Sequence, residues 1–207
     1  MKYKAYKYRI YPTKRQEVLI AKHLGCCRFL YNYALDKKVK AYQKDKTNIS
    51  RYQIQAELPT MKKSEKYCWL SEVNSLSLQA ALANLDSAFV KFFREKKGFP
   101  KFKSKKDNRQ SFPIPQNTRV AFDEGRVYIP KFKEGIKARF HRKFEGCIKT
   151  SVITRTPTHK YFISILVEVN EQDAKENPIS ESKAVGIDLG IKTFAVLSDG
   201  TEIPNHK

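Results

Sequence analysis

The sequence predicts an α+β fold in which a block of helices interrupts a set of β-strands. In KYKAYKYRIY, residues 2–11, aromatic and β-branched residues alternate with Lys and Arg, as in a strand. Short alternating or fully apolar runs return only after residue 110, and apolar residues recur at helical spacing in between. One early strand and about six later ones are therefore expected to bracket an inserted helical block.

The helical block begins at Thr13, which is placed as an N-cap. Apolar positions recur at helical spacing over residues 14–43, and Gly25 predicts a break into two helices. Further helices are expected over about 52–58 and about 76–93, the second with an apolar stripe broad enough to be a buried face.

The later strands are separated by turn-forming residues. RVAFDEGRVYIPKF, from residue 119, places apolar residues on both sides of an Asp-Glu-Gly turn, which predicts a β-hairpin. Strands are also expected in GIKARF, CIKTSVITR and KYFISILVEV. Residues 171–183 are polar and acidic and contain a proline, which favours a linker. From residue 184 the sequence predicts three short strands, near 184–188, 193–198 and 201–204, with an uncovered apolar face.

The charge of the chain favours nucleic acid as a partner. The formal net charge is +20, from 41 Lys and Arg against 21 Asp and Glu, and residues 1–183 carry all of the excess. A compact body with such an excess attracts polyanions. The alternative is a basic protein whose charge serves only solubility, but solubility needs far less charge and is better served by acidic residues.

The cysteines do not form a readable metal site. The four cysteines include no C-x-x-C pair and no histidine partner at zinc spacing; they are Cys26, Cys27, Cys68 and Cys147. With no signal peptide and no apolar run of membrane length, the sequence predicts reduced, buried thiols in a cytoplasmic protein. Neither a membrane nor a small-molecule substrate is an expected partner.

A basic, aromatic segment follows the last predicted helix. FFREKKGFPKFKSKKDNRQSF, from residue 92, contains eight basic residues and only two acids between Arg94 and Arg109. Lys and Arg neutralise phosphates, whereas a planar ring can stack on an unpaired base or anchor a loop to the core. Phe99 and Phe102 are interpreted as anchors. Phosphate contacts are expected from Lys101, Lys103, Lys105, Lys106 and Arg109.

Four segments together resemble one protein family. YKYRIYPTKRQEVLIAKHLGCCRFLYNYAL, GFPKFKSKK, YFISILVE and VGIDLGIKTFAVLSDG occur in order along essentially the whole chain. Their order and spacing resemble those of the TnpB proteins, also called OrfB, of IS200/IS605 transposons. These are RNA-guided DNA endonucleases related to the Cas12 effectors. The resemblance implies that the partners are a guide RNA and a target DNA.

The resemblance also implies a domain organisation. Residues 1–12 and 110–170 would form a wedge-type β-barrel, and residues 13–109 an inserted helical recognition lobe with a helix-turn-helix-like start. Residues 184–207 would begin a RuvC nuclease domain of RNase H-like fold. Within the helical lobe, Gln79 matches a position that contacts the DNA motif beside the target. Tyr52 is a second candidate, although Arg51 interrupts the Ser-Tyr pair that is usual in the family. An amide bonds an adenine edge bidentately, although Gln79 also fits an ordinary exposed helix position.

The family resemblance makes Asp188, directly after the apolar run AVGI, the first catalytic carboxylate of a two-metal Mg²⁺ site. Members of the family continue to a second catalytic Glu, a four-cysteine zinc module and a final Asp, none of which occurs here. The chain is therefore expected to be catalytically incomplete, to bind Mg²⁺ weakly and to need a C-terminal nuclease half. Asp199 is interpreted as a turn residue. Lys192 fits either a phosphate contact or a solvated loop.

Three other interpretations remain open at this stage. GIDLG is also similar to the phosphate loop of the sugar-kinase, Hsp70 and actin superfamily, but there small hydroxyl residues follow, whereas here Ile191 and Lys192 follow. The chain also fits a stand-alone DNA- or RNA-binding protein derived from a transposase. The third interpretation is a non-functional transposon remnant. For the TnpB-like interpretation itself, a fragment and a natural truncation both stay open.

Overall fold

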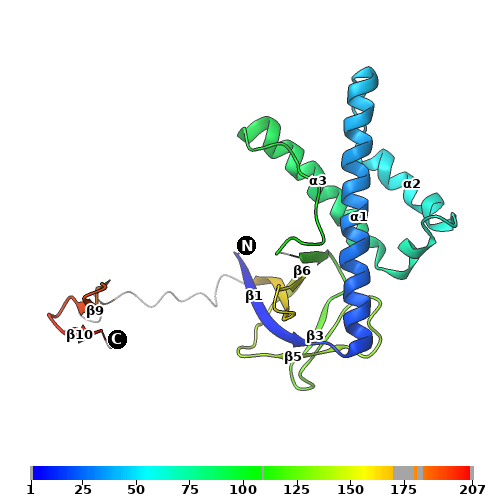
Figure 1. Cartoon of the computed structure of the whole chain (residues 1–207). Helices are drawn as coiled ribbons and strands as arrows, with labels where there is room; N and C mark the ends of the chain where they lie inside the picture. Colours follow the sequence, from blue (N-terminus) through cyan, green and yellow to red (C-terminus); the bar gives the residue numbers. More distant parts are fainter. Residues whose placement is uncertain (1, 109, 170–179, 181–183, 206–207) are drawn as a thin grey trace. The chain divides into compact units, whose positions relative to one another are not determined.

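A computed structural model describes residues 2–108, 110–169, 180 and 184–205 of the chain. The chain divides into two compact units, residues 1–170 and residues 171–207 (Figure 1). Apart from Ser180, the predicted linker at 171–183 lies outside the described residues.

The first unit contains a curled sheet of seven antiparallel strands in the order β2-β6-β7-β1-β5-β4-β3 (Figure 1). The early strand therefore lies in the middle of the sheet, between β7 and β5. None of the pairings among the described residues joins β2 to β3, so the sheet has two edges. The predicted α+β class is confirmed. The strands are β1 (Lys2–Tyr11), β2 (Gln110–Ile114), β3 (Arg119–Ala121), β4 (Arg126–Tyr128), β5 (Ile136–Arg139), β6 (Cys147–Arg155) and β7 (Tyr161–Val169).

The helices lie between β1 and β2 in sequence, as predicted. They are α1 (Lys14–Asp45), α2 (Arg51–Lys63), a short 3₁₀ helix η1 (Cys68–Glu72) and α3 (Ser75–Glu95). Thr13 caps α1: its Oγ1 accepts from the Gln16 N–H at 3.4 Å, and Gln16 Oε1 accepts from the Thr13 N–H at 3.0 Å. Ser50 and Gln53 form the same capping box on α2, which begins one residue before the prediction and ends five residues after it.

The predicted break at Gly25 is wrong, because α1 is a single helix of 32 residues. A glycine inside a helix costs roughly 1 kcal/mol relative to alanine. That cost is offset by the burial of Leu24, Cys26 and Cys27 on either side of it, and of Leu30 one turn later. Tertiary packing therefore outweighs the local preference.

One hydrophobic core joins the sheet to the helices. Tyr8 and Ile163 are fully buried on the inner face of the sheet. The imidazole of His23 on α1 stacks on Phe112 of β2 with ring centroids 4.8 Å apart, and lies 5.7 Å from the ring of Phe132. The N-terminal half of α1 thus covers the sheet, and the rest of the helix packs against α3 and α2.

Two of the four cysteines depart from the prediction. Cys26 and Cys27 are buried, and burial raises the pKa of their thiols to about 11 and about 12. Cys68 and Cys147 are exposed, so the prediction of buried thiols is wrong for them. Cys68 begins the surface helix η1, and Cys147 begins β6 at a position facing away from the core.

The second unit is a small antiparallel sheet. It consists of β8 (Ile187–Leu189), β9 (Thr193–Leu197) and β10 (Glu202–Pro204), in the order β10-β9-β8. Three short strands are confirmed, as is the uncovered apolar face: Ile187 is 63% exposed and Leu189 is 70% exposed. In the part of the chain that the structure describes, no helix has both the length and the apolar character needed to cross a membrane.

Candidate nucleic-acid interface

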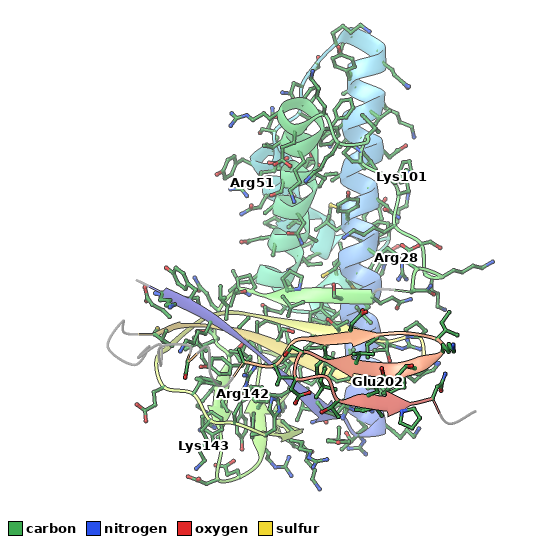
Figure 2. The ribbon with its side chains drawn as sticks, turned by 90° about the vertical axis from the view of Figure 1, so that its left-hand side faces the viewer. Arg28, Arg51, Lys101, Arg142, Lys143 and Glu202 are labelled. Carbon is green, nitrogen blue, oxygen red and sulfur yellow. The ribbon has the colours of Figure 1, made fainter. Side chains whose placement is uncertain are left out.

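The connecting segment, residues 96–108, joins α3 to β2 and contains most of the predicted phosphate contacts. It begins where α3 ends at Lys96, in a left-handed conformation with φ of 50°. Asn32 on α1 then holds it: the Asn32 Nδ2 donates to the Lys103 carbonyl at 2.9 Å, and the Lys103 N–H donates to Asn32 Oδ1 at 2.8 Å. The segment therefore runs along α1, where Figure 2 shows Lys101.

The lysines of the connecting segment are not equivalent. The Lys103 ammonium lies 4.2 Å from the centroid of the Tyr31 ring, and burial lowers its pKa. Its backbone and its charge both help to dock the segment, so its phosphate contact stays a prediction. All four predicted lysines are exposed overall, but the ammonium groups of Lys101, Lys105 and Lys106 have neither a carboxylate partner nor an aromatic ring contact among the described residues. These three cations are free to meet a phosphate.

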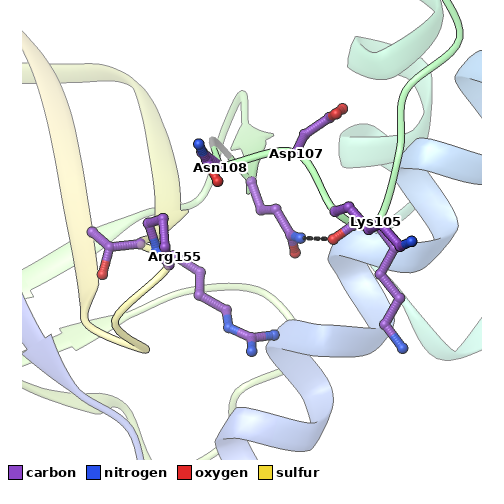
Figure 3. A pocket seen from close by; sticks show the side chains of 8 residues that line it. Lys105, Asp107, Asn108 and Arg155 are labelled. Atoms are coloured by element: carbon purple, nitrogen blue, oxygen red, sulfur yellow. Dashed lines mark hydrogen bonds between the residues drawn. The ribbon is translucent and has the colours of Figure 1, made fainter.

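A hollow of about 190 Å³ lies between the connecting segment and the turn that joins β6 to β7 (Figure 3). Arg155 extends into it from β6, and its Nη2 lies 2.6 Å from Nδ1 of His159. The carboxylate of Asp107 accepts from the Ser104 N–H at 2.8 Å, which holds the loop in shape. The residues that line the hollow are Lys105, Lys106, Asp107, Asn108, Gln110, Arg155, Thr156 and Pro157.

The hollow has the chemistry of a phosphate site, with three cations around one carboxylate that already has a donor. Sequence reasoning missed Arg155. The register of the sheet places it there, because Gln110 of β2 pairs with Arg155 of β6. The signal would have been the pairing of these two strands, which no local pattern reveals. Arg109, predicted as a phosphate contact, lies outside the described residues.

The two phenylalanines of the segment differ. Phe99 makes edge contacts with Phe92 and Phe89 at centroid distances of 5.3 and 5.7 Å but is 48% exposed, so it anchors the segment to α3 and not in the core as predicted. Phe102 is 60% exposed, so the same prediction is wrong for it. Neighbouring side chains of an extended segment point in opposite directions, and Lys103 takes the direction of α1.

The outer face of the seven-stranded sheet, which points away from the core, is a second basic surface. Arg9 of β1 lies directly opposite Arg139 of β5, and Lys137 of β5 lies opposite Arg126 of β4. Like charges at directly opposed positions destabilise a sheet in water. A polyanion on this face would relieve that repulsion. Sequence analysis noted the basic and aromatic alternation of β1 but could not know which strands flank it.

Tyr52 and Gln79 lie on different helices. Tyr52, on α2, is 66% exposed, and the neighbouring Arg51 donates from Nη2 to its hydroxyl at 2.8 Å. The Arg51 Nε also lies 3.8 Å from Oδ2 of Asp86 on α3, and Arg51 is labelled in Figure 2. Gln79 is half-buried on α3. In the described ranges no hydrogen bond joins the Tyr52 and Gln79 side chains, and their roles in reading DNA stay predictions.

Asp188, on β8, is exposed and pairs in register with Val196. No group of three or more His, Cys, Asp or Glu side chains among the described residues is arranged to hold a metal ion. A two-metal centre needs several converging carboxylates, so the residues present do not fit it.

Asp199 Oδ1 accepts from the Thr201 N–H at 2.9 Å, which confirms its turn role, and Lys192 is exposed.

Comparison with known proteins places the chain in a family. Residues 1–47 match the family described as the helix-turn-helix domain of IS605 OrfB. A putative RNA-guided DNA endonuclease of Streptomyces pristinaespiralis is 36% identical over 208 residues, which cover 99% of this chain and 50% of that protein. The chain belongs to the TnpB/OrfB family of IS605 transposon proteins. Within that family, the putative RNA-guided DNA endonuclease InsQ of Escherichia coli (strain K12) is 29% identical, over 95% of this chain and 48% of InsQ.

This TnpB/OrfB chain spans about half the length of the curated relatives that it matches along its whole length. The virulence protein VsdF of Salmonella dublin is 38% identical over 111 residues, which cover 49% of this chain and 93% of VsdF. A chain of a solved Cas12f1–sgRNA–target DNA complex matches with a TM-score of 0.42 and 14% identity, over 96% of this chain and 54% of that chain.

The helix-turn-helix description does not apply to the shape of residues 1–47 in this member of the TnpB/OrfB family. They form the central strand β1 and the single long helix α1. A helix that docks in the major groove as the second of a pair is therefore not available in this range. The basic surfaces of the connecting segment and of the sheet are the candidates for nucleic-acid contact.

Proposed function

We propose that this chain is the nucleic-acid-binding part of an RNA-guided DNA endonuclease and that it holds a guide RNA and a target DNA. The observation that carries the proposal is the group of cations around the connecting segment: Lys105, Lys106 and Arg155 line one hollow, and Lys101 is exposed elsewhere on the same segment. Arrays of lysine and arginine bind the phosphate backbone by releasing counterions. The relatives described as putative RNA-guided DNA endonucleases support the same activity.

The finer domain roles belong to this proposal. The seven-stranded sheet, from residues 1–12 and 110–170, takes the part of the wedge-type barrel, and residues 13–109 take the part of the recognition lobe. Residues 184–207 are the first strands of the RuvC domain. Target DNA lies near Tyr52 and Gln79, where the amide of Gln79 reads an adenine edge.

Cleavage needs more than these residues provide. Asp188 supplies one metal-binding carboxylate, and Mg²⁺ in the complete site would activate the attacking water and stabilise the leaving oxygen. A C-terminal nuclease half supplies the remaining carboxylates and covers the apolar face that includes Ile187 and Leu189. The chain by itself therefore binds nucleic acid without cutting it.

The salt dependence of RNA binding tests the binding role. The variant with Lys101→Ala, Lys105→Ala and Lys106→Ala should bind a single-stranded RNA more weakly. The slope of log K against log salt should fall by about 0.7 for each lost contact. The matched control changes three carboxylate-paired lysines to alanine and removes the same charge; they are Lys40, Lys143 and Lys149. An equal fall in both variants, or no fall in the first, contradicts the proposal.

Incubation with metal tests the nuclease role. The chain with Mg²⁺ or Mn²⁺, a guide RNA and matching DNA should give no cleavage by itself. Metal-dependent cleavage that disappears on Asp188→Ala would show that one carboxylate per chain suffices, and the proposed need for a second half would be wrong.

Footprinting of Gln79→Ala on randomised duplexes tests the DNA-reading role, which fails if the sequence preference is undiminished.

A further inference from the structure

Two aromatic rings lie beside Arg9 on the outer face, that of Tyr11 on the same strand and that of Phe162 on the neighbouring strand β7. Phe162 of β7 lies directly opposite Arg9 of β1. The Lys7 Nζ is 4.8 Å and the Arg9 Cζ is 5.1 Å from the centroid of the Phe162 ring. The ring is only partly buried, because its neighbours along β7, Tyr161 and Ile163, take the two positions that face the core.

The cations extend from Phe162 across three further strands. Arg9 of β1 is followed by Arg139 of β5 in direct register, and Lys137 of β5 is followed by Arg126 of β4. Adjacent strands lie about 4.8 Å apart, so these charges are close together. Within the described ranges no carboxylate pairs with Lys7, Arg9 or Arg139.

The other side of Phe162 is different. Its register partner on β6 is Thr154, and the partner of Thr154 on β2 is Ser111. Lys7 is paired with Ser164 on β7. The small side chains of Thr154 and Ser111 thus lie on the β6 side of the ring, while the cations flank it on the β1 side. The surface therefore combines an apolar ring, small polar neighbours and an adjacent row of Lys and Arg side chains.

We propose that the outer face binds a single-stranded segment of nucleic acid, with one base stacked on Phe162 and the neighbouring phosphates at Lys7, Arg9 and Arg139. The inference deepens the proposed function and rests on it, because it names the form of nucleic acid that this surface takes. A base replaces Lys7 and Arg9 on the ring face, and the two cations turn to phosphates. A duplex hides the faces of its bases, so only a single strand can stack.

This arrangement explains a feature that a merely solvated surface does not. Opposed arginines repel each other, and an exposed sheet face gains solubility from mixed charges. A phosphate between Arg9 and Arg139 converts the repulsion into two favourable contacts. The cost in the free protein is then recovered on binding.

The test measures binding of the full chain to a fluorescein-labelled twelve-nucleotide oligo-U RNA by anisotropy. Phe162→Ala should weaken binding by about five- to a hundredfold, because base stacking on an aromatic residue contributes that much. The salt slope should not change, since no charge is lost. Phe162→Tyr keeps the ring and should retain wild-type affinity. The matched control is Leu166→Ala, on the same face of β7 between Ala5 and Thr150, which should bind as the wild type.

A second variant does not depend on the ring. Arg139→Gln should lower the salt slope by about 0.7 to 0.9 and leave the thermal stability equal or higher, because it relieves the repulsion with Arg9. A purely structural role for Arg139 would instead lower stability. Unchanged binding by both Phe162→Ala and Arg139→Gln overturns the inference.

The outcomes separate this inference from the proposed function. If the Phe162 and Arg139 variants bind normally while the triple lysine variant is impaired, the outer face is not the site and the proposed function stands. If the wild-type chain binds neither RNA nor DNA, both fall. A blunt duplex that binds as tightly as oligo-U overturns the preference for a single strand. Tighter binding of oligo-U or oligo-dT than of the duplex supports it, and their ratio identifies the ligand as RNA or DNA.

Discussion

The two sheets of this chain are built from the same alternating pattern but differ in what covers them. In the first unit, Ile163 and Ile165 on β7 are fully buried, because helix α1 and the loop carrying Phe132 pack on their side of the sheet. In the second unit, Ile187 and Leu189 are 63% and 70% exposed. Alternation therefore decides which residues share a face, whereas burial requires a second layer packed on that face.

The largest expected effect concerns the core. Ile163→Ala should lower the free energy of unfolding of the first unit by about 2–5 kcal/mol, because it leaves a cavity in a packed interior. Ile187→Ala should change stability by less than about 0.5 kcal/mol, since its side chain is already exposed. Urea denaturation followed by circular dichroism measures both. Similar effects for the two variants would show that the second sheet is also covered.

The stability of the first unit should fall in mild acid. His23 is buried; its Nδ1 donates to the Leu19 carbonyl at 2.8 Å and its Nε2 accepts from the Asn74 N–H at 3.1 Å. Burial lowers the pKa of His23, and Lys131 adds to this effect, while the bond to Leu19 opposes it. The unfolded chain, with a pKa of about 6.5, then takes up the proton first as the pH falls.

This stability is therefore complete above about pH 6.5 and is lost progressively as the pH falls below that value. Urea unfolding at pH 7.5 and pH 5.5 measures the loss, and His23→Gln should reduce it. The second sheet, residues 187–204, contains no histidine and should not share this dependence. An equal loss in the wild type and in His23→Gln would assign the acid sensitivity to other groups.

The Asn32 side chain should have a moderate effect. Asn32→Ala removes both hydrogen bonds to Lys103, each contributing roughly 0.5–1.5 kcal/mol, and should release the connecting segment from α1. Limited proteolysis should then cut residues 96–108 faster. In the described part of the second unit the Asn205 side chain makes one comparable bond, from Nδ2 to the Ile191 carbonyl at 2.8 Å, so Asn205→Ala is the matched control. Equal protection of the connecting segment in wild type and Asn32→Ala would show that Asn32 does not hold the segment against α1.

The smallest effects should have opposite signs in the two units. Gly25→Ala should stabilise the first unit by about 0.5–1 kcal/mol, because a Cβ there meets nothing within 4 Å and alanine favours the helix. Gly200→Ala should destabilise the hairpin of the second unit, since Gly200 has φ of 88°, where a side chain is strained. Thermal melting of both variants gives the signs. Destabilisation by Gly25→Ala would mean that α1 needs flexibility at that point.

Local patterns predicted the elements well and their arrangement poorly. The alternation in residues 2–11, the Asp-Glu-Gly turn after residue 122 and the cap at Thr13 each act over a few residues, so the sequence reveals them directly. The position of β1 between β5 and β7 depends on pairing with residues more than a hundred positions away. Gly25 failed as a predictor because packing on both sides of it outweighs its own preference.

The candidate site was predicted in part for the same reason. The charge of the connecting segment is a local property, and its lysines were found from composition alone. Arg155 reaches the hollow, and Arg9, Arg139 and Phe162 come together on the outer face, only through strand register. The hydrogen bonds between Asn32 and Lys103 were not predicted either, because the sequence does not show which distant backbone an asparagine in a helix will bond.

The unbroken helix α1 gives the molecule a lever arm. Its 32 residues make a rod about 48 Å long at 1.5 Å per residue. The N-terminal part of the helix is fixed to the sheet through the stacking of His23 on Phe112. Toward its C-terminal end, the Lys38 Nζ lies 3.2 Å from Oδ1 of Asp86 on α3. From His23 to the far end the helix is about 33 Å long, so a tilt of about 5° at His23 displaces that end by about 3 Å, which is more than a hydrogen bond tolerates. Load placed on the sheet is thus transmitted to the distant helices as a change of position rather than absorbed by a joint.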